Sequence, residues 1–187
     1  MSLFYVRRKS VFVAGTALLG AAVAVLDLGV RLKIPFPLLP YLKFDVLGIP
    51  MLLSSFLFGF FSGTITSLVA WLSISTRDSF SGFMKFAAEF STVVGVYVVL
   101  RARSPRSVWW KALAMVSGVL VRVIVMAVAN VMLLPVFMPT FYKTYDAVMV
   151  LIPLISLFNV IQGAVSVFGG FLLYEAVVLR LPSLKHE

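Results

Sequence analysis

Long apolar runs alternate with short polar or proline-rich stretches along the whole chain. The runs cover residues 11–30, 46–61, 64–75, 83–100, 108–136 and 147–179. A helix that crosses a bilayer needs about 20 predominantly apolar residues, so the pattern predicts an all-α integral membrane protein with six transmembrane helices. We expect a tight turn at Ser62 and Gly63, between the second and third runs. The last run is long enough to predict a break near Pro153 or an extension into water.

The stretch between the first two runs contains three prolines. Pro35, Pro37 and Pro40 lie within six residues. Proline fixes φ and lacks a backbone N–H, so a regular helix cannot form there. The residues around the prolines are largely apolar, which predicts an ordered, amphipathic loop between helices 1 and 2.

Composition supports the membrane assignment. Hydrophobic residues make up 61% of the chain and charged residues 12%, whereas a soluble domain has about 25% charged residues. This excludes an ordinary soluble domain and a disordered chain. Six helices would use about 120 residues, so we interpret residues 1–187 as one six-span membrane domain without a large domain outside the bilayer.

Few residues are suited to catalysis or to binding a metal. The chain contains no cysteine, and its single histidine is His186. A thiolate metal site, a disulfide and a buried Ser–His pair are therefore excluded. No phosphate-binding G-x-x-x-x-G-K-[ST] loop is present, so the chain has no ATPase motif of its own. We do not expect an enzyme, a metal site or a bound cofactor.

The basic residues predict the orientation in the membrane. The formal net charge is +9, and the Lys and Arg side chains cluster at the ends of the apolar runs, which indicates a membrane signal and not a nucleic-acid partner. If both termini are cytoplasmic, nine basic residues lie on the inner side and five on the outer side. The positive-inside rule then favours a multi-pass protein of the cell membrane with both termini in the cytoplasm and the proline-rich loop outside.

Three amides lie inside the predicted helices. Asn159 and Gln162 are three residues apart, so they project from one helix face. Asn130 lies at a compatible depth in the run 108–136. Amides both donate and accept hydrogen bonds, so these three favour a pocket for a ligand with a polar edge, although amides also join helices in membranes.

Charged residues inside the runs are further candidates, because a charge in the bilayer is costly. Lys85 and Glu89 are four residues apart, so they lie on one helix face. We expect them to form an ion pair or to bind the ligand. For Arg122, snorkelling or pairing with a neighbouring helix is favoured over contact with a substrate. Asp27 lies late in the first run, and Trp71 lies where a belt residue or a stacking partner would be expected.

Small residues recur along the first apolar run. Ala17 and Ala21 form a small-xxx-small pair, and Gly20 and Ala24 form a second one. Such pairs let helices approach closely in lipid. The pattern is compatible with packing inside this protein or with a docking face for a second membrane protein.

Three segments carry a resemblance to a known family. They are Ala17-Leu-Leu-Gly-Ala21, the loop 34–45 followed by Ile49-Pro50, and Leu157-Phe-Asn159-Val-Ile-Gln162-Gly163. In this order the chain resembles the S components of energy-coupling factor (ECF) vitamin transporters, specifically the riboflavin-specific type. The last segment is similar to a Pro-Phe-Asn-x-x-Lys-Gly pattern of that family, from which Leu157 and Gln162 depart.

The resemblance implies riboflavin as the transported ligand. Asn130, Asn159 and Gln162 would then face the flavin. The proline-rich loop would act as a lid. Further candidates for ligand contact are Leu42 and Phe44 on the lid, Asp45, Lys85 and Glu89 for the ribityl hydroxyls, and Trp71.

The resemblance also implies partners. A transmembrane coupling subunit and two cytoplasmic ATPases would drive uptake, with Ala17, Gly20, Ala21 and Ala24 as the docking face. Two alternatives remain open. One is an S component for another vitamin or small metabolite, and the other is a structural six-span scaffold protein that binds no small molecule.

Overall fold

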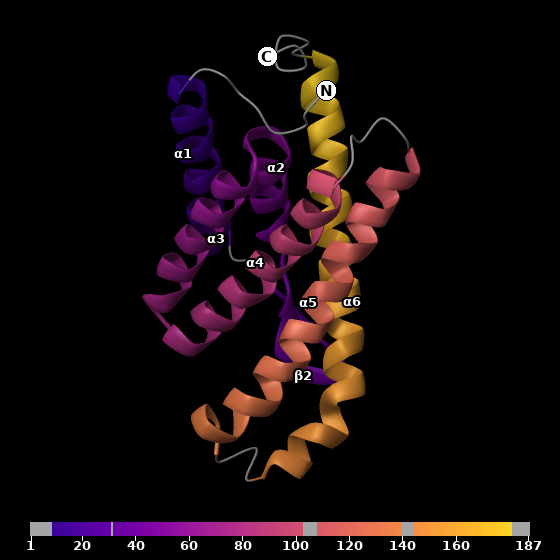
Figure 1. Ribbon diagram of the computed structural model, residues 1–187. Coiled ribbons are helices and arrows are strands. Elements are labelled where there is room, and N and C mark those ends of the chain that lie inside the picture. Colours follow the sequence, from indigo (N-terminus) through magenta and orange to yellow (C-terminus); the bar gives the residue numbers. More distant parts are fainter. Residues whose placement is uncertain (1–8, 31, 103–107, 140–143, 181–187) are drawn as a thin grey trace.

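The structure is a computed structural model that describes residues 9–30, 32–102, 108–139 and 144–180. Within these ranges the chain forms six α-helices and one small hairpin (Figure 1). The elements are α1 (Lys9–Val25) with a π-helical continuation η1 (Leu26–Val30), β1 (Ile34–Phe36), β2 (Leu39–Phe44), α2 (Gly48–Phe58), α3 (Phe60–Ser75), α4 (Ser79–Ala102), α5 (Val108–Phe137) and α6 (Tyr145–Arg180).

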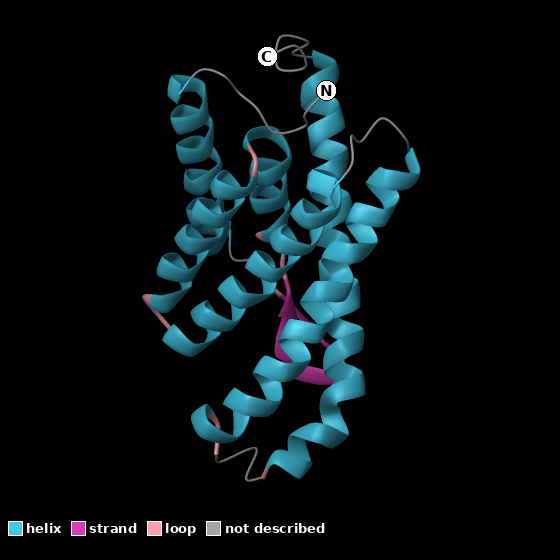
Figure 2. Cartoon of the chain, viewed as in Figure 1, coloured by secondary structure: helices cyan, strands magenta, loops and turns pink. Residues whose placement is uncertain are grey.

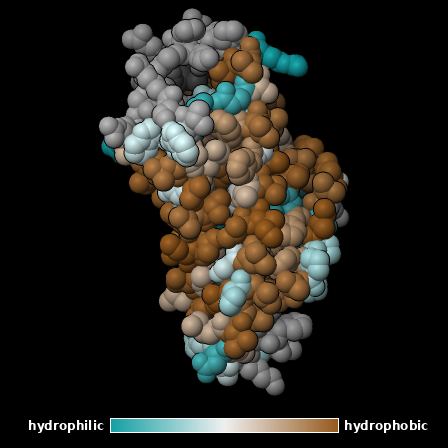
Figure 3. Space-filling view, turned by 90° about the vertical axis from the view of Figure 1, so that its right-hand side faces the viewer, coloured by the Kyte–Doolittle hydropathy of each residue, from teal (hydrophilic) through white to brown (hydrophobic). Residues whose placement is uncertain are grey.

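The helices have the lengths and the surface of a membrane protein. Four segments are long and apolar enough to cross a bilayer, namely Lys9–Val30, Ser79–Ala102, Trp109–Phe137 and Tyr145–Arg180. The helices α2 and α3 are apolar but shorter. Hydrophobic residues cover most of the face seen in Figure 3. The chain is therefore a multi-pass membrane protein, and the start of α1 and the end of α6 lie at the same end of the bundle (Figure 1).

The proline-rich loop is ordered, as the sequence predicted, but it forms strands. In the antiparallel hairpin Ile34 pairs with Phe44, and the register shifts between Pro35 and Phe36 (Figure 2). The hairpin packs on α5 and α6 through a buried apolar cluster of Phe36, Leu39, Leu134, Val148, Ile155 and Phe158. This packing fixes a segment whose prolines exclude a helix.

The turn between the second and third helices lies earlier than predicted. Gly59 has a φ of 91°, a left-handed conformation that favours glycine, and it separates α2 from α3. Ser62 and Gly63 instead lie inside α3. A Cβ atom on Gly63 would lie 2.8 Å from the Ser55 Cβ, so this glycine serves close packing and does not form the turn.

The predicted break near Pro153 is also absent. α6 continues through Pro153 as a single helix of 36 residues, and α5 likewise contains Pro135. An internal proline removes a backbone hydrogen bond but does not have to end a helix that its neighbours hold in place. The alternative prediction, a helix longer than the bilayer requires, remains.

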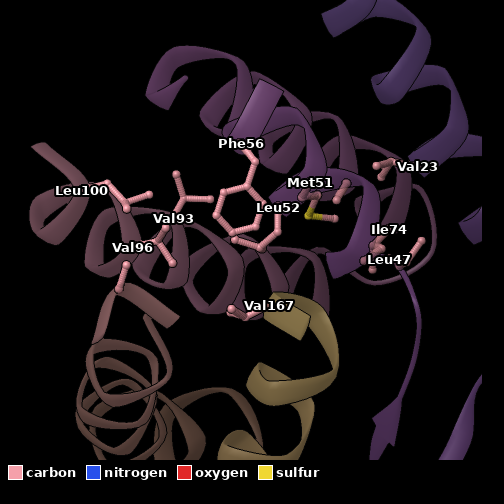
Figure 4. Packing of buried hydrophobic residues seen from close by; sticks show 12 residues of the cluster. Val23, Leu47, Met51, Leu52, Phe56, Ile74, Val93, Val96, Leu100 and Val167 are labelled. Atoms are coloured by element: carbon pink, nitrogen blue, oxygen red, sulfur yellow. The ribbon is translucent and has the colours of Figure 1, made fainter. Parts of the chain in front are cut away.

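The helix α2 lies at the centre of the bundle. It is mostly apolar, and its two serines, Ser54 and Ser55, are buried as well. This is typical of a buried helix, and Met51 and Leu52 are fully buried. Its side chains meet residues from α1, α3, α4 and α6 (Figure 4). Gly170 of α6 allows a close approach, since a Cβ atom there would lie 2.7 Å from the Leu52 Cβ.

Glycines also bring α4 and α5 together. A Cβ atom on Gly95 would lie 2.7 Å from the Ser117 carbonyl oxygen and 2.8 Å from the Gly118 Cα. Both neighbours are backbone atoms, which cannot move aside cheaply. This contact fixes the positions of α4 and α5, from which the polar residues of the site project.

Candidate functional site

A cavity of about 320 Å³ lies beneath the hairpin. This volume falls at the lower end of the range for small-molecule pockets, about 300–1,000 Å³. Four residues of α5 line it at four-residue intervals, which places them on one helix face. The lining comprises Lys33, Tyr41, Leu42, Lys43 and Asp45 around the hairpin; Ile74, Arg77 and Asp78; Phe80, Ser81, Met84, Lys85 and Ala88; Arg122, Met126, Asn130, Leu134 and Met138; and Phe158, Asn159 and Gln162.

A network of buried ion pairs joins the hairpin to α4 and α5. The Lys85 Nζ lies 2.7 Å from the Asp45 Oδ1 and 3.0 Å from the Glu89 Oε1. The Arg122 Nη1 lies 2.9 Å from the same Glu89 oxygen. The side chains of Glu89 and Arg122 are 0% and 2% exposed, so each charge depends on its partners for stabilisation.

Gln162 holds the chain that follows β2. Its Nε2 donates to the Asp45 carbonyl oxygen at 2.8 Å, and the Asp45 N–H donates back to its Oε1 at 3.2 Å. The Asp45 carboxylate also accepts a hydrogen bond from the Leu47 N–H at 3.0 Å. Gln162 therefore anchors the hairpin to α6 with both ends of its amide.

The other two amides make hydrogen bonds within their own helices. Asn159 donates from Nδ2 to the Ile155 carbonyl at 2.9 Å and accepts at Oδ1 from the Arg122 Nε at 3.2 Å. Asn130 donates from Nδ2 to the Met126 carbonyl at 2.6 Å. Asn159 thus orients Arg122, while Asn130 can offer its oxygen to the cavity.

Most of the predicted site residues meet at this cavity. Leu42, Asp45, Lys85, Asn130, Asn159 and Gln162 line it. Phe44, Glu89 and Trp71 do not.

Each of these three has another environment. Phe44 packs against Phe158 with ring centroids 4.8 Å apart, behind the cavity wall. Glu89 reaches the cavity only through its cationic partners. Trp71 stacks on Phe86 at 5.6 Å, so its contacts are with neighbouring aromatic rings.

Arg122 is the main residue that the sequence interpretation undervalued. Pairing with a neighbouring helix was predicted and occurs through Glu89, but Arg122 also lines the cavity. The series Arg122, Met126 and Asn130 has a four-residue spacing, so Asn130 and Arg122 share a face. That spacing was the signal that could have identified it.

A second ionic group lies at the cavity residues Lys33, Arg77 and Asp78, which we call the rim. The Asp27 carboxylate, which is fully buried, accepts from the Arg77 Nη2 at 2.7 and 2.6 Å, from the Ser73 hydroxyl at 2.8 Å and from the Lys33 Nζ at 3.2 Å. This group joins η1 to the end of α3. Because Lys33 and Arg77 also line the cavity, the end of α1 is coupled to the rim.

Asp78 caps the start of α4 at the same rim. Its carboxylate accepts from the Ser81 hydroxyl and from the backbone N–H groups of Phe80 and Ser81, the latter two at 3.0 and 3.2 Å. These bonds, led by that of the Ser81 hydroxyl, hold the pKa of Asp78 below its ordinary value. The capped helix end positions the first cavity residues of α4.

The small residues of α1 divide between two faces. Ala17 and Ala21 are exposed, whereas Ala24 is half-buried. Gly20 is buried against α3, where a Cβ atom would lie 3.5 Å from the Val69 Cγ2. Of the four predicted docking residues, Gly20 is therefore a packing residue within the bundle, and only Ala17 and Ala21 lie on the exposed face.

The chain resembles a protein of known structure. No protein-family model and no curated protein matches it. A solved structure described as the S component of a bacterial ECF transporter shares 28% sequence identity, with a TM-score of 0.76. The match covers 93% of this chain and 99% of the other. This similarity over nearly the whole length of both chains supports the S-component class of membrane protein that the sequence predicted.

Proposed function

We propose that the protein is the substrate-binding S component of an ECF-type importer and that its substrate is riboflavin. The observation that carries the proposal is the cavity beneath the hairpin, with buried donors and acceptors in its lining, in a chain similar to an S component. The protein captures the vitamin and holds it for an ATP-driven coupling module.

The chemistry of the cavity suits a flavin. The isoalloxazine ring is a flat, largely apolar plate with a polar pyrimidinedione edge. Met84, Met126 and Phe158 supply apolar walls, and Arg122 and Asn130 supply polar groups at the cavity surface. Apolar walls with a few polar groups are typical of small-molecule sites.

The orientation follows from the basic residues and the helix ends. We place both termini in the cytoplasm, as the positive-inside rule favours. The hairpin then lies toward the outer side, where it covers the cavity. The protein then lies in the cell membrane, and the substrate enters the cavity from the outer side.

Ligand binding tests the function directly. The chain is purified in detergent, its visible absorbance is recorded, and riboflavin is titrated against tryptophan fluorescence. We expect a yellow preparation or saturable quenching at about one flavin per chain. A colourless protein without quenching would exclude riboflavin. A thermal-shift panel of other vitamins would then separate an S component of different specificity from a scaffold protein, which should bind none of them.

The exposed face of α1 is the proposed contact with the transmembrane coupling subunit, which works with two cytoplasmic ATPases. Ala21→Trp should block uptake in cells and leave riboflavin binding intact. Leu172→Trp is the matched control, because Leu172 is an exposed apolar residue of α6. Normal uptake by the Ala21 variant, or a combined loss of uptake and binding, would contradict the docking role.

A further inference from the structure

Arg122 is one of the largest fully buried side chains, and it lies at the surface of the cavity. Its guanidinium is held in place on two sides. Nε donates to the Asn159 Oδ1 at 3.2 Å, and Nη1 lies 2.9 Å from the Glu89 Oε1. Asn159 is itself fixed by its bond to the Ile155 carbonyl, so the plane of the guanidinium is determined from α4 and from α6.

The third nitrogen of the Arg122 guanidinium is Nη2. Nη2 donates to no residue that the structure describes. A guanidinium carries five N–H donors in a fixed planar fork. Unused donors on a buried cation are costly unless another group accepts their hydrogen bonds. Because Arg122 lines the cavity, a ligand in the cavity can supply that acceptor.

The amides near Arg122 are already engaged. Gln162 uses both its oxygen and its nitrogen on the Asp45 backbone. Asn159 uses its nitrogen on its own helix and its oxygen on Arg122. These two amides therefore position the hairpin and the guanidinium, and beside them Arg122 retains a donor that a ligand can use.

The charges of the buried cluster indicate which acceptor fits. Two cations, Lys85 and Arg122, are joined to two anions, Asp45 and Glu89. The cluster is electrically neutral without a ligand. Beside Arg122, a neutral ligand with carbonyl or imine acceptors preserves this balance, whereas an anion there would add a charge that no group of this four-residue cluster neutralises.

We propose that Arg122 is the specificity-determining residue of the cavity and binds the acceptor edge of a neutral heteroaromatic ligand. Asn159 is its positioning residue. For riboflavin, on whose proposed binding this assignment rests, the acceptor edge is the pyrimidinedione end of the isoalloxazine, with its carbonyl oxygens and ring nitrogen. The planar fork of arginine matches two adjacent acceptors.

Two ligands separate the ring edge from the ribityl chain. Riboflavin and lumiflavin, which carries a methyl group in place of the ribityl chain, are titrated against the full chain and against Arg122→Gln and Arg122→Lys. We expect Arg122→Gln to weaken both ligands by the same factor, about 10- to 100-fold, the range for a hydrogen bond to a charged group. The affinities of Arg122→Lys should lie between those of the unmodified chain and those of Arg122→Gln, because lysine keeps the charge and loses the planar fork.

Controls keep the outcome independent of folding. Lys111→Gln removes a cation that pairs with Glu175 outside the cavity and should leave both affinities unchanged. Thermal unfolding in detergent reports whether each variant is folded, and Arg122→Lys carries the comparison if Arg122→Gln is not.

The possible outcomes are distinguishable. A loss confined to riboflavin would show that Arg122 contacts the ribityl chain and would overturn the assignment, as would unchanged affinities. Failure of the unmodified protein to bind either ligand would overturn the proposed function, and the assignment with it. Asn159→Ala provides a further check, because loss of the bond that orients Arg122 should weaken both ligands equally and by less than Arg122→Gln does.

Discussion

Two parts of the bundle bury polar groups in different ways. Between α1, α2 and α3, away from the Asp27 group of η1, the groups are hydroxyls. The Ser62 Oγ lies 2.6 Å from the Thr16 Oγ1 and 2.5 Å from the Ser54 Oγ. We call these three residues the hydroxyl seam. Between the hairpin, α4, α5 and α6 the groups are the ion pairs of Asp45, Lys85, Glu89 and Arg122.

This difference distinguishes polar groups that stabilise helix packing from polar groups that can bind a ligand. In the hydroxyl seam each group bonds another across a packed helix interface, which is the usual role of Ser and Thr in membrane helices. The ionic cluster lies against a cavity and retains donors that the described residues do not use. In this bundle the polar residue that fits a binding site is therefore one that both lines the cavity and retains donors, as Arg122 does.

Among the variants considered, Glu89→Gln should cause the largest loss in the free energy of unfolding. This change removes the anion that lies against both Lys85 and Arg122 and leaves two buried cations with only Asp45 to balance them. Breaking a buried pair costs about 3–5 kcal/mol, so we expect a loss of this size in unfolding measurements in detergent. Glu175→Gln breaks a pair in which both side chains are about one-third exposed, and it should cost about 0–1 kcal/mol. Equal losses would contradict the distinction.

The same substitution should have opposite effects in the two parts of the bundle. Gly95→Ala places a Cβ atom against the backbone of α5 and should destabilise the protein by about 1–3 kcal/mol. Gly20→Ala meets the Val69 side chain at an ordinary 3.5 Å and gains about 0.5–1 kcal/mol from helix propensity. Unfolding temperatures of the two variants test this, and a loss at both positions would show that α1 and α3 are packed as tightly as α4 and α5.

At the rim, Asp78→Ala should cost about 1 kcal/mol by removing the cap of α4, whereas Asp78→Asn should preserve most of it, since Asn also caps well. The folded-state pKa of Asp78 is below the ordinary value of 3.8. Its ionised form therefore adds stability above pH 3.8, and that stability is lost as the pH falls through the lowered pKa. Unfolding measured against pH in the unmodified protein and in the two variants checks both parts, because only the unmodified protein should lose the Asp78 contribution as the pH falls. An Asn variant as unstable as the Ala variant would exclude a capping role.

The smallest effect is expected in the hydroxyl seam. Ser62→Ala removes the hydroxyl that Thr16 and Ser54 share. Polar contacts between membrane helices average about 0.6 kcal/mol and reach about 1.7. A loss in this range, with unchanged riboflavin affinity, would confirm the structural role. A loss as large as that of Glu89→Gln would remove the contrast between the two parts.

The sequence predicted the helices better than their junctions. Six apolar runs correspond to six helices because lipid requires long apolar segments. The turn was assigned to Ser62 and Gly63, whereas the structure places it at Gly59. Both glycines suit a turn locally. Gly63 is used for contact with Ser55, and a tertiary contact of this kind cannot be read from local propensity.

For the site, the sequence predicted depth and helix face but not the hydrogen-bond partners. Helical spacing placed Asn159 and Gln162 together, and both line the cavity. That Gln162 bonds the Asp45 backbone, 117 residues away, depends on how the hairpin folds over α6. The same holds for Arg122, whose orientation depends on Glu89 and Asn159 from two other helices.

The short helix α3 has a consequence for the surrounding lipid. Its 16 residues extend about 24 Å, less than the hydrocarbon thickness of about 30 Å, whereas the 36 residues of α6 extend about 54 Å. Phe61, Ile65 and Leu72 expose α3 to the acyl chains. A helix of this length favours a thinner bilayer along one side of the protein, and the elastic cost of that thinning rises with acyl-chain length. Thicker membranes would raise the free energy of an orientation in which α3 stands along the membrane normal. Lipid composition therefore helps to determine the tilt of the protein in the membrane.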